Sequence, residues 1–180
     1  MKKIVIFLCL FFVTFAFAQK TVYILNNSTK TVYLINLKTK PLTGTYPYYI
    51  ATGFNTANNI IGPGKILILE NVSNLLKFPF SFNTSQVSDL FVNSWRFYLN
   101  SSSLGTNTSN VTCYNSPNST NQIFDRVSIR VGVGGSLGVG TLGLNYPSTV
   151  QGNGWYADYA LSTDPNFPNL QETIITINDL

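Results

Sequence analysis

The chain opens with a pattern of charged, apolar and small residues that is typical of a secretory signal peptide. Two lysines precede an unbroken apolar run from Ile4 to Phe15, and Ala16-Phe17-Ala18 then leads to the polar Gln19. The apolar run has about half the length of a membrane span, so the pattern predicts cleavage rather than anchoring. We therefore expect residues 1–18 to be removed and the protein to be secreted, into the periplasm if the source is a Gram-negative bacterium.

Short alternating or β-branched runs recur along residues 19–180 and predict one all-β domain. Turns rich in Gly, Pro or Asn separate the runs, and prolines from Pro41 to Pro168 leave no room for a long helix. Many short strands with frequent turns favour an antiparallel β-sandwich, with a small β-barrel as the second choice. The clearest strands are expected at residues 65–70, 95–99, 127–133, 155–161 and 173–177.

A near-repeat forms the start of this domain. Residues 21–30 and 31–40 are identical at six of ten positions. Residues 26–29 supply turn chemistry between the two runs, so the repeat predicts a β-hairpin. Both faces of each run are apolar, which places these strands inside the sandwich rather than at its rim.

Two further segments depart from the strand pattern. Ser85 could cap a short helix near residues 85–94 that carries Val87, Leu90 and Phe91 at helical spacing. Residues 100–122 are dominated by Asn, Ser and Thr, so we expect a long, exposed excursion around one short strand at 111–114. A loop of this kind can carry a binding surface or simply tolerate sequence drift.

The composition excludes several classes of chemistry. The chain has no histidine, which removes Ser-His-Asp catalysis and histidine-ligated zinc. Cleavage of the signal peptide removes Cys9 and leaves Cys113 alone, so no disulfide can form within the chain. We expect Cys113 to be buried, the alternative being a Cys113-linked dimer, and we expect no metal or cofactor.

The basic residues are spread out and do not predict nucleic-acid binding. The signal peptide takes two of the 11 basic residues, so 9 face 7 acidic residues in the mature chain. The densest group comprises Lys30, Lys38 and Lys40, which we interpret as solvated charges at the edge of a sheet.

Aromatic residues around a carboxylate give the most site-like motif. Trp155, Tyr156, Asp158 and Tyr159 lie within five residues, a composition that suits sugar binding. The alternative is an ordinary strand with one polar face. A glycosidase would need two carboxyls about 5 to 10 Å apart, and spacing alone pairs none of its candidates, which are Glu70, Asp89, Asp125, Asp158, Asp164 and Glu172. Asp125 and Arg126 resemble an ion pair at the start of a strand, and no calcium-binding loop motif is present.

A glycine-rich run covers residues 132–143. Residues 138–143 match G-x-G-x-x-G, but Asn145 and Pro147 follow too closely for a helix to open there, so we expect a tight, twisted hairpin instead of a dinucleotide site. The apolar, uncharged segment 131–144 could alternatively insert into a membrane.

The sequence contains eight N-x-S/T motifs (sequons), which would carry N-linked glycans only in a eukaryotic secretory pathway. They are Asn26, Asn27, Asn71, Asn83, Asn100, Asn107, Asn110 and Asn118. Together these features predict a secreted, non-enzymatic β-sandwich that binds carbohydrate or protein at a cell surface or in a matrix. A pore-forming β-protein and a carboxylate-based glycoside hydrolase are the alternatives.

Overall fold

The structure is a computed structural model that describes residues 20–54, 59–70, 79–80, 92–119, 122–164 and 167–180. The signal peptide and most of the helix expected near residues 85–94 fall outside these ranges, as do Asn71, Asn83 and Asp89. Residues 92–94, which end the expected helix, belong to a strand.

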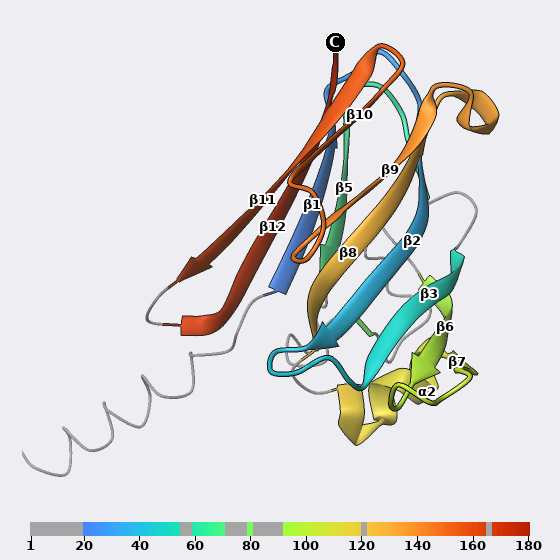
Figure 1. Cartoon of the computed structure of the whole chain (residues 1–180), viewed down its shortest axis with the longest axis vertical. Coiled ribbons are helices and arrows are strands. Elements are labelled where there is room, and N and C mark those ends of the chain that lie inside the picture. The colour runs from blue at the N-terminus through green and yellow to red at the C-terminus, as the bar shows by residue number, and fades with distance from the viewer. Residues whose placement is uncertain (1–19, 55–58, 71–78, 81–91, 120–121, 165–166) are drawn as a thin grey trace, which may run out of the picture.

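Two mostly antiparallel sheets pack face to face, which confirms the predicted β-sandwich; they do not close into a barrel (Figure 1). Sheet A has the order β10 (Thr149–Gly152), β11 (Trp155–Asp164), β12 (Phe167–Asp179), β1 (Lys20–Asn26) and β5 (Lys65–Glu70). Sheet B has the order β7 (Thr106–Ser109), β6 (Val92–Tyr98), β3 (Tyr48–Phe54), β2 (Val32–Pro41), β8 (Gln122–Val131) and β9 (Gly138–Gly143), and β4 (Ile60–Ile61) pairs with β2. The runs expected at 65–70, 155–161 and 173–177 are all strands, and those at 95–99 and 127–133 are strands over most of their length.

The predicted β1–β2 hairpin is wrong, because the two halves of the near-repeat lie in different sheets. Strand β1 pairs with β12 in parallel and with β5, whereas β2 lies between β3 and β8. The buried Asn26 explains the crossing: its Nδ2 donates to the carbonyl oxygens of Lys30, Ile61 and Gly62 at 2.7, 2.9 and 3.0 Å. These bonds satisfy the carbonyl of Lys30 and two carbonyls at the end of β4, and the chain passes from one sheet to the other as an arch.

The end of the chain holds this arch in place. Because β1 and β12 run parallel, the arch and Asp179 lie at the same end of the sandwich. One carboxylate oxygen of Asp179 accepts a bond from the backbone N–H of Thr29 at 2.9 Å, and the other is paired with Lys30. Hydrogen bonding by Lys30 is the main reason that the pKa of Asp179 is lowered.

The strand expected at residues 111–114 is also wrong, because this segment is the helix α2 (Asn110–Asn115). Ser109 caps the helix by accepting a hydrogen bond from the backbone N–H of Thr112 at 3.1 Å. The indole of Trp95 donates to the Asn110 side chain at 3.0 Å, which ties the helix to β6. In the described part of this segment, residues 100–119, polar side chains thus cap the helix and form turns, and Cys113 is buried there as expected.

The glycine-rich run forms the predicted hairpin. Strands β8 and β9 pair antiparallel around the short 3-10 turn η3 (Val133–Gly135). Glycines are needed where the hairpin and β10 meet the indole of Trp155. A Cβ on Gly152 would lie 2.3 Å from the Trp155 Nε1, and one on Gly140 would lie 3.2 Å from the same ring.

Candidate functional site

The aromatic motif on β11 does not form one site, which corrects the sequence prediction. Trp155 is fully buried, and its Nε1 donates to the Leu137 carbonyl at 2.7 Å. Tyr159 packs against the core and stacks on Phe124, with 6.1 Å between ring centroids, and burial raises the pKa of Tyr159 to about 12. Neighbouring side chains of a strand point to opposite faces, so Tyr156 lies on the other side of the sheet.

The carboxylates also take separate structural roles. Asp158 accepts a hydrogen bond from Thr149 at 2.8 Å on the outer side of sheet A. Asp125 is buried in sheet B and forms an ion pair with Lys38, with 2.9 Å between Lys38 Nζ and Asp125 Oδ2, rather than with the adjacent Arg126. Among the described residues, no three Cys, Asp or Glu side chains are grouped so that they could hold a metal ion.

Tyrosines gather instead on the outer face of sheet B. The Tyr48 and Tyr98 rings, from the paired strands β3 and β6, are stacked with 4.6 Å between centroids, and Tyr46 lies 5.2 Å from Tyr48. Gly105 lies against the Tyr98 ring with φ of +77°, and a Cβ there would come within 2.7 Å of the ring. This glycine leaves space for Tyr98 to occupy its position beside Tyr48.

Cations lie beside these rings in one cross-strand row. The register places Arg96 of β6 opposite Ile50 of β3, Ile50 opposite Lys38 of β2, and Lys38 opposite Arg126 of β8. Lys38 Nζ is 4.3 Å from the Tyr48 ring centroid, a favourable cation–π distance. The Arg126 guanidinium lies 5.1 Å from the Tyr146 ring centroid and donates to the Tyr146 hydroxyl.

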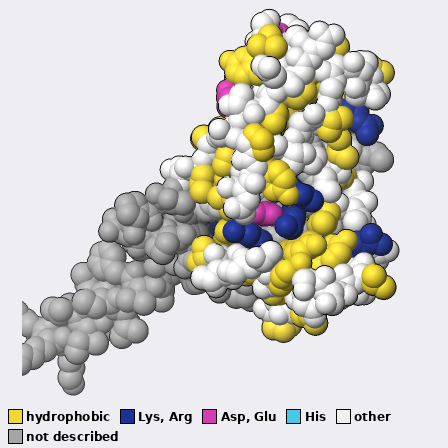
Figure 2. All heavy atoms as spheres, in the orientation of Figure 1, with side chains coloured by type: hydrophobic (Ala, Val, Ile, Leu, Met, Phe, Trp, Pro, Cys, Tyr) yellow, Lys and Arg dark blue, Asp and Glu magenta, His cyan; other side chains and the backbone are white. Residues whose placement is uncertain are grey.

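We call this surface the tyrosine–cation face; it comprises Tyr46, Tyr48, Tyr98, Tyr146, Lys38, Arg96 and Arg126. In the view of Figure 2, basic groups appear at several points, with apolar side chains and acidic groups among them. Lys38 therefore lies in the middle of a sheet, and the interpretation of it as an edge charge is corrected. Sequence reasoning missed the face because its members come from five separate segments; the local signals were two pairs at two-residue spacing, Tyr46 with Tyr48 and Arg96 with Tyr98.

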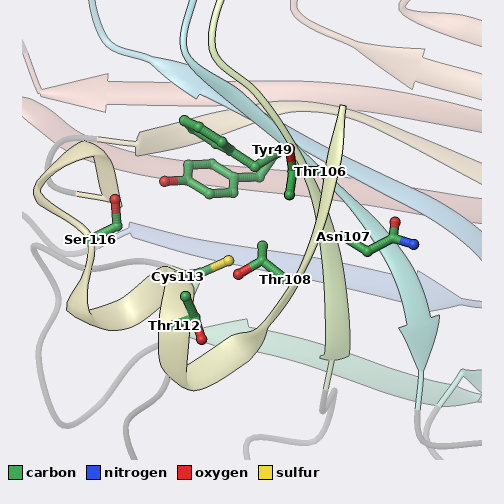
Figure 3. Close-up of a pocket in the computed structure, with 8 residues that line it drawn as sticks. Tyr49, Thr106, Asn107, Thr108, Thr112, Cys113 and Ser116 are labelled. Carbon is green, nitrogen blue, oxygen red and sulfur yellow. The ribbon is translucent and has the colours of Figure 1, made fainter. Parts of the chain in front are cut away.

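A pocket opens on the inner side of the same strands, beneath α2 (Figure 3). It has a volume of about 330 Å³. The rings of Tyr49 and Phe97, 4.9 Å apart between centroids, line one side. Across from them the Ser116 side chain points toward Tyr49, and the Cys113 thiol points toward Thr108 (Figure 3). The remaining lining residues are Thr106, Asn107 and Thr112.

The groups in this pocket stay uncharged near neutral pH. Burial raises the pKa of the Cys113 thiol to about 12, so the thiol is not a nucleophile there. Burial also raises the pKa of Tyr49 to about 12, partly offset by Ser116. Cys113 is only 1% exposed, which argues against a disulfide between two chains.

Burial divides the described sequons into two groups. Asn26 and Asn110 are buried and hydrogen-bonded, so the folded protein has no space for a glycan on either. Asn27, Asn100 and Asn107 are exposed, and Asn118 is half-buried.

The segment expected as an alternative membrane hairpin belongs to the sandwich at its two ends. Val131 and Leu142 are fully buried in the core, whereas Val133 and Val139 are 81% and 60% exposed. Within the described ranges, no helix has the length and apolar character needed to cross a membrane.

Comparison with known proteins adds no assignment to this site. The chain matches no protein-family model, no curated protein and no solved structure.

Proposed function

We propose that this chain is a secreted, non-enzymatic β-sandwich that binds carbohydrate through its tyrosine–cation face. The observation that carries the proposal is the stacked pair Tyr48–Tyr98, which lies beside Lys38 on an outer sheet surface. Tyr46 extends the same cluster and is 37% exposed.

The chemistry of these side chains suits a sugar. One side of a pyranose ring presents C–H groups that pack on an aromatic face, and its hydroxyls then reach polar groups at the edge. Tyrosine provides an apolar ring and a polar hydroxyl in one rigid side chain. Lys38 is held by Asp125 and Arg126 by Tyr146, so the polar partners are ordered before a ligand arrives, and preorganisation of this kind favours affinity.

The positions of two central carboxylates favour binding over hydrolysis. A glycosidase requires an acid and a second carboxylate across one sugar. Asp125 lies in sheet B and is neutralised by Lys38, whereas Asp158 is on the outer side of sheet A. The two carboxylates thus belong to different sheets, and each already has a structural partner.

Glycan-array binding followed by calorimetry tests the proposal. We expect the mature protein to bind a subset of glycans, and Tyr98→Ala to lower the affinity about tenfold, or 1.4 kcal/mol. Tyr156→Ala is the matched control, because Tyr156 lies on the outer side of the other sheet. Failure to bind any glycan, or equal losses in the two variants, would contradict the proposal.

A further inference from the structure

The charge on the tyrosine–cation face is unbalanced. Its cross-strand row contains three cations, and the carboxylate described among them, Asp125, is already paired with Lys38 at 2.9 Å. Arg96 and Arg126 therefore remain as excess positive charge at the two sides of the pair. From this arrangement we infer that the ligand is an acidic polysaccharide, one that carries carboxylate or sulfate groups; the inference rests on the proposed function.

The spacing of the row suits a linear polymer. Neighbouring strands lie about 4.8 Å apart, so the backbones at Arg96 and Lys38, two strands apart, are separated by roughly 10 Å. Arg126 follows on the next strand. A chain that lies across the strands would thus meet cations at successive points along its length, with the tyrosine rings at one side.

Arg126 is the best-prepared anion partner in the row. Its guanidinium lies 5.1 Å from the Tyr146 ring centroid and donates to the Tyr146 hydroxyl, so its position is fixed before an anion binds. A guanidinium matches the geometry of carboxylate and sulfate oxygens with two parallel N–H donors. Because Tyr146 fixes the plane of the group, little side-chain freedom is lost when an anion binds.

The aromatic geometry favours a polysaccharide over a nucleic acid. Proteins that bind single-stranded nucleic acid stack successive bases on separate aromatic rings. Here the Tyr48 and Tyr98 rings are stacked on each other at 4.6 Å, which leaves no gap for a base between them. Their outer surfaces and edges remain for the flat side of a sugar.

The experiment uses charged and uncharged ligands of the same backbone. Polygalacturonate is compared with its methyl ester, and dextran sulfate with dextran, by calorimetry or biolayer interferometry on the mature protein. We expect at least one charged polymer to bind in preference to its uncharged partner. Its affinity should fall when salt is raised from about 0.05 M to about 0.5 M, because the contacts are screened.

Two variants test the row itself. Arg96→Gln should weaken binding of the charged polymer about two- to fivefold, which is the range of an exposed ion pair. The double variant, Arg96→Gln with Arg126→Gln, should weaken binding on the order of tenfold, because the effects of separate sites add. Lys65→Gln is the control, because Lys65 is an exposed cation in sheet A. Its affinity should match that of the unmodified protein.

The outcomes separate this inference from the proposed function. Equal binding of charged and uncharged polymers that is lost in Tyr98→Ala would overturn the acidic specificity and leave carbohydrate binding standing. Single-stranded DNA could bind as tightly as the best polysaccharide and lose affinity equally in Arg96→Gln. This result would overturn the inference that the ligand is a polysaccharide. Binding of none of the four polymers, and of no array glycan, would overturn both.

Discussion

Strand β11 and the strand pair β3–β6 both carry clustered aromatic residues, but only the second cluster forms a surface. On β11, Trp155 and Tyr159 point into the sandwich, and Tyr156 lies on the opposite side of the sheet. Tyr48 and Tyr98 lie 50 residues apart in the chain, yet the β3–β6 register makes them direct neighbours. Aromatic residues that are close in sequence are thus split by the two-residue period of a strand, whereas a shared face is assembled from different strands.

The largest expected effect comes from the buried member of the first cluster. Trp155→Ala removes a fully buried indole that Gly140 and Gly152 closely surround, so we expect a loss of about 3–5 kcal/mol in the free energy of unfolding. Chemical denaturation measures this change. Tyr156→Ala, one residue along the strand, should cost about 0.5 kcal/mol; equal losses would show that β11 is not divided into an inner and an outer side.

The second effect is on binding rather than stability. Tyr48→Ala removes a ring that stacks on Tyr98 and lies under Lys38, so we expect the affinity for the ligand of the tyrosine–cation face to fall about tenfold. The free energy of unfolding should fall by no more than about 1 kcal/mol, since the side chain is half-buried. A calorimetric titration together with a denaturation curve checks both values. A variant that loses stability but binds normally would place Tyr48 with the structural residues.

Alkaline pH tests the burial of the inward-facing Tyr49 and Tyr159. The pKa of Tyr49 and of Tyr159 is raised from 10.0 to about 12, so between these values the folded protein binds more protons than the unfolded chain. Their contribution to stability is complete below pH 10 and is lost as the pH rises to about 12. Tyr49→Phe should therefore flatten the alkaline decline in the free energy of unfolding. Tyr98→Phe, which removes an outward-facing hydroxyl, is the control, and an identical decline in Tyr49→Phe and the unmodified protein would contradict the assignment.

The smallest expected effect is the difference in N-glycosylation between exposed and buried sequons. In a eukaryotic secretory host, the folded protein should carry glycans at exposed sequons such as Asn27, Asn100 or Asn107 and none at Asn26 or Asn110. Mass spectrometry of glycopeptides from the secreted protein measures occupancy at each position. Full occupancy of Asn26 in protein that remains folded would contradict the buried arch.

Local patterns in the sequence were enough to predict the sandwich and several of its strands. Val127, Ile129 and Val131 of β8 alternate with more polar residues and are buried, and Gly62-Pro63-Gly64 directly precedes β5. Pairing between distant strands could not be predicted, because the parallel partner of β1 is β12, at the other end of the chain. The same limit hid the tyrosine–cation face, since Lys38, Tyr98 and Arg126 look ordinary until the register of sheet B brings them together.

The near-repeat shows how one buried polar group can override a local signal. Residues 21–30 and 31–40 have the strand propensity and the turn residues of a hairpin. Asn26 instead donates to three carbonyl oxygens, two of them near β4, and so directs the chain across the sandwich. Asn36, its counterpart in the second copy, lies inside β2 instead.

One comparison of affinities tests the central claim most directly. It measures how tightly Tyr98→Ala and Tyr156→Ala bind a glycan that the unmodified protein binds, under the same conditions. The account predicts an affinity about tenfold weaker for Tyr98→Ala and an unchanged affinity for Tyr156→Ala, with both variants folded. Unchanged binding by Tyr98→Ala with a clear loss in Tyr156→Ala would contradict it and place the ligand on sheet A.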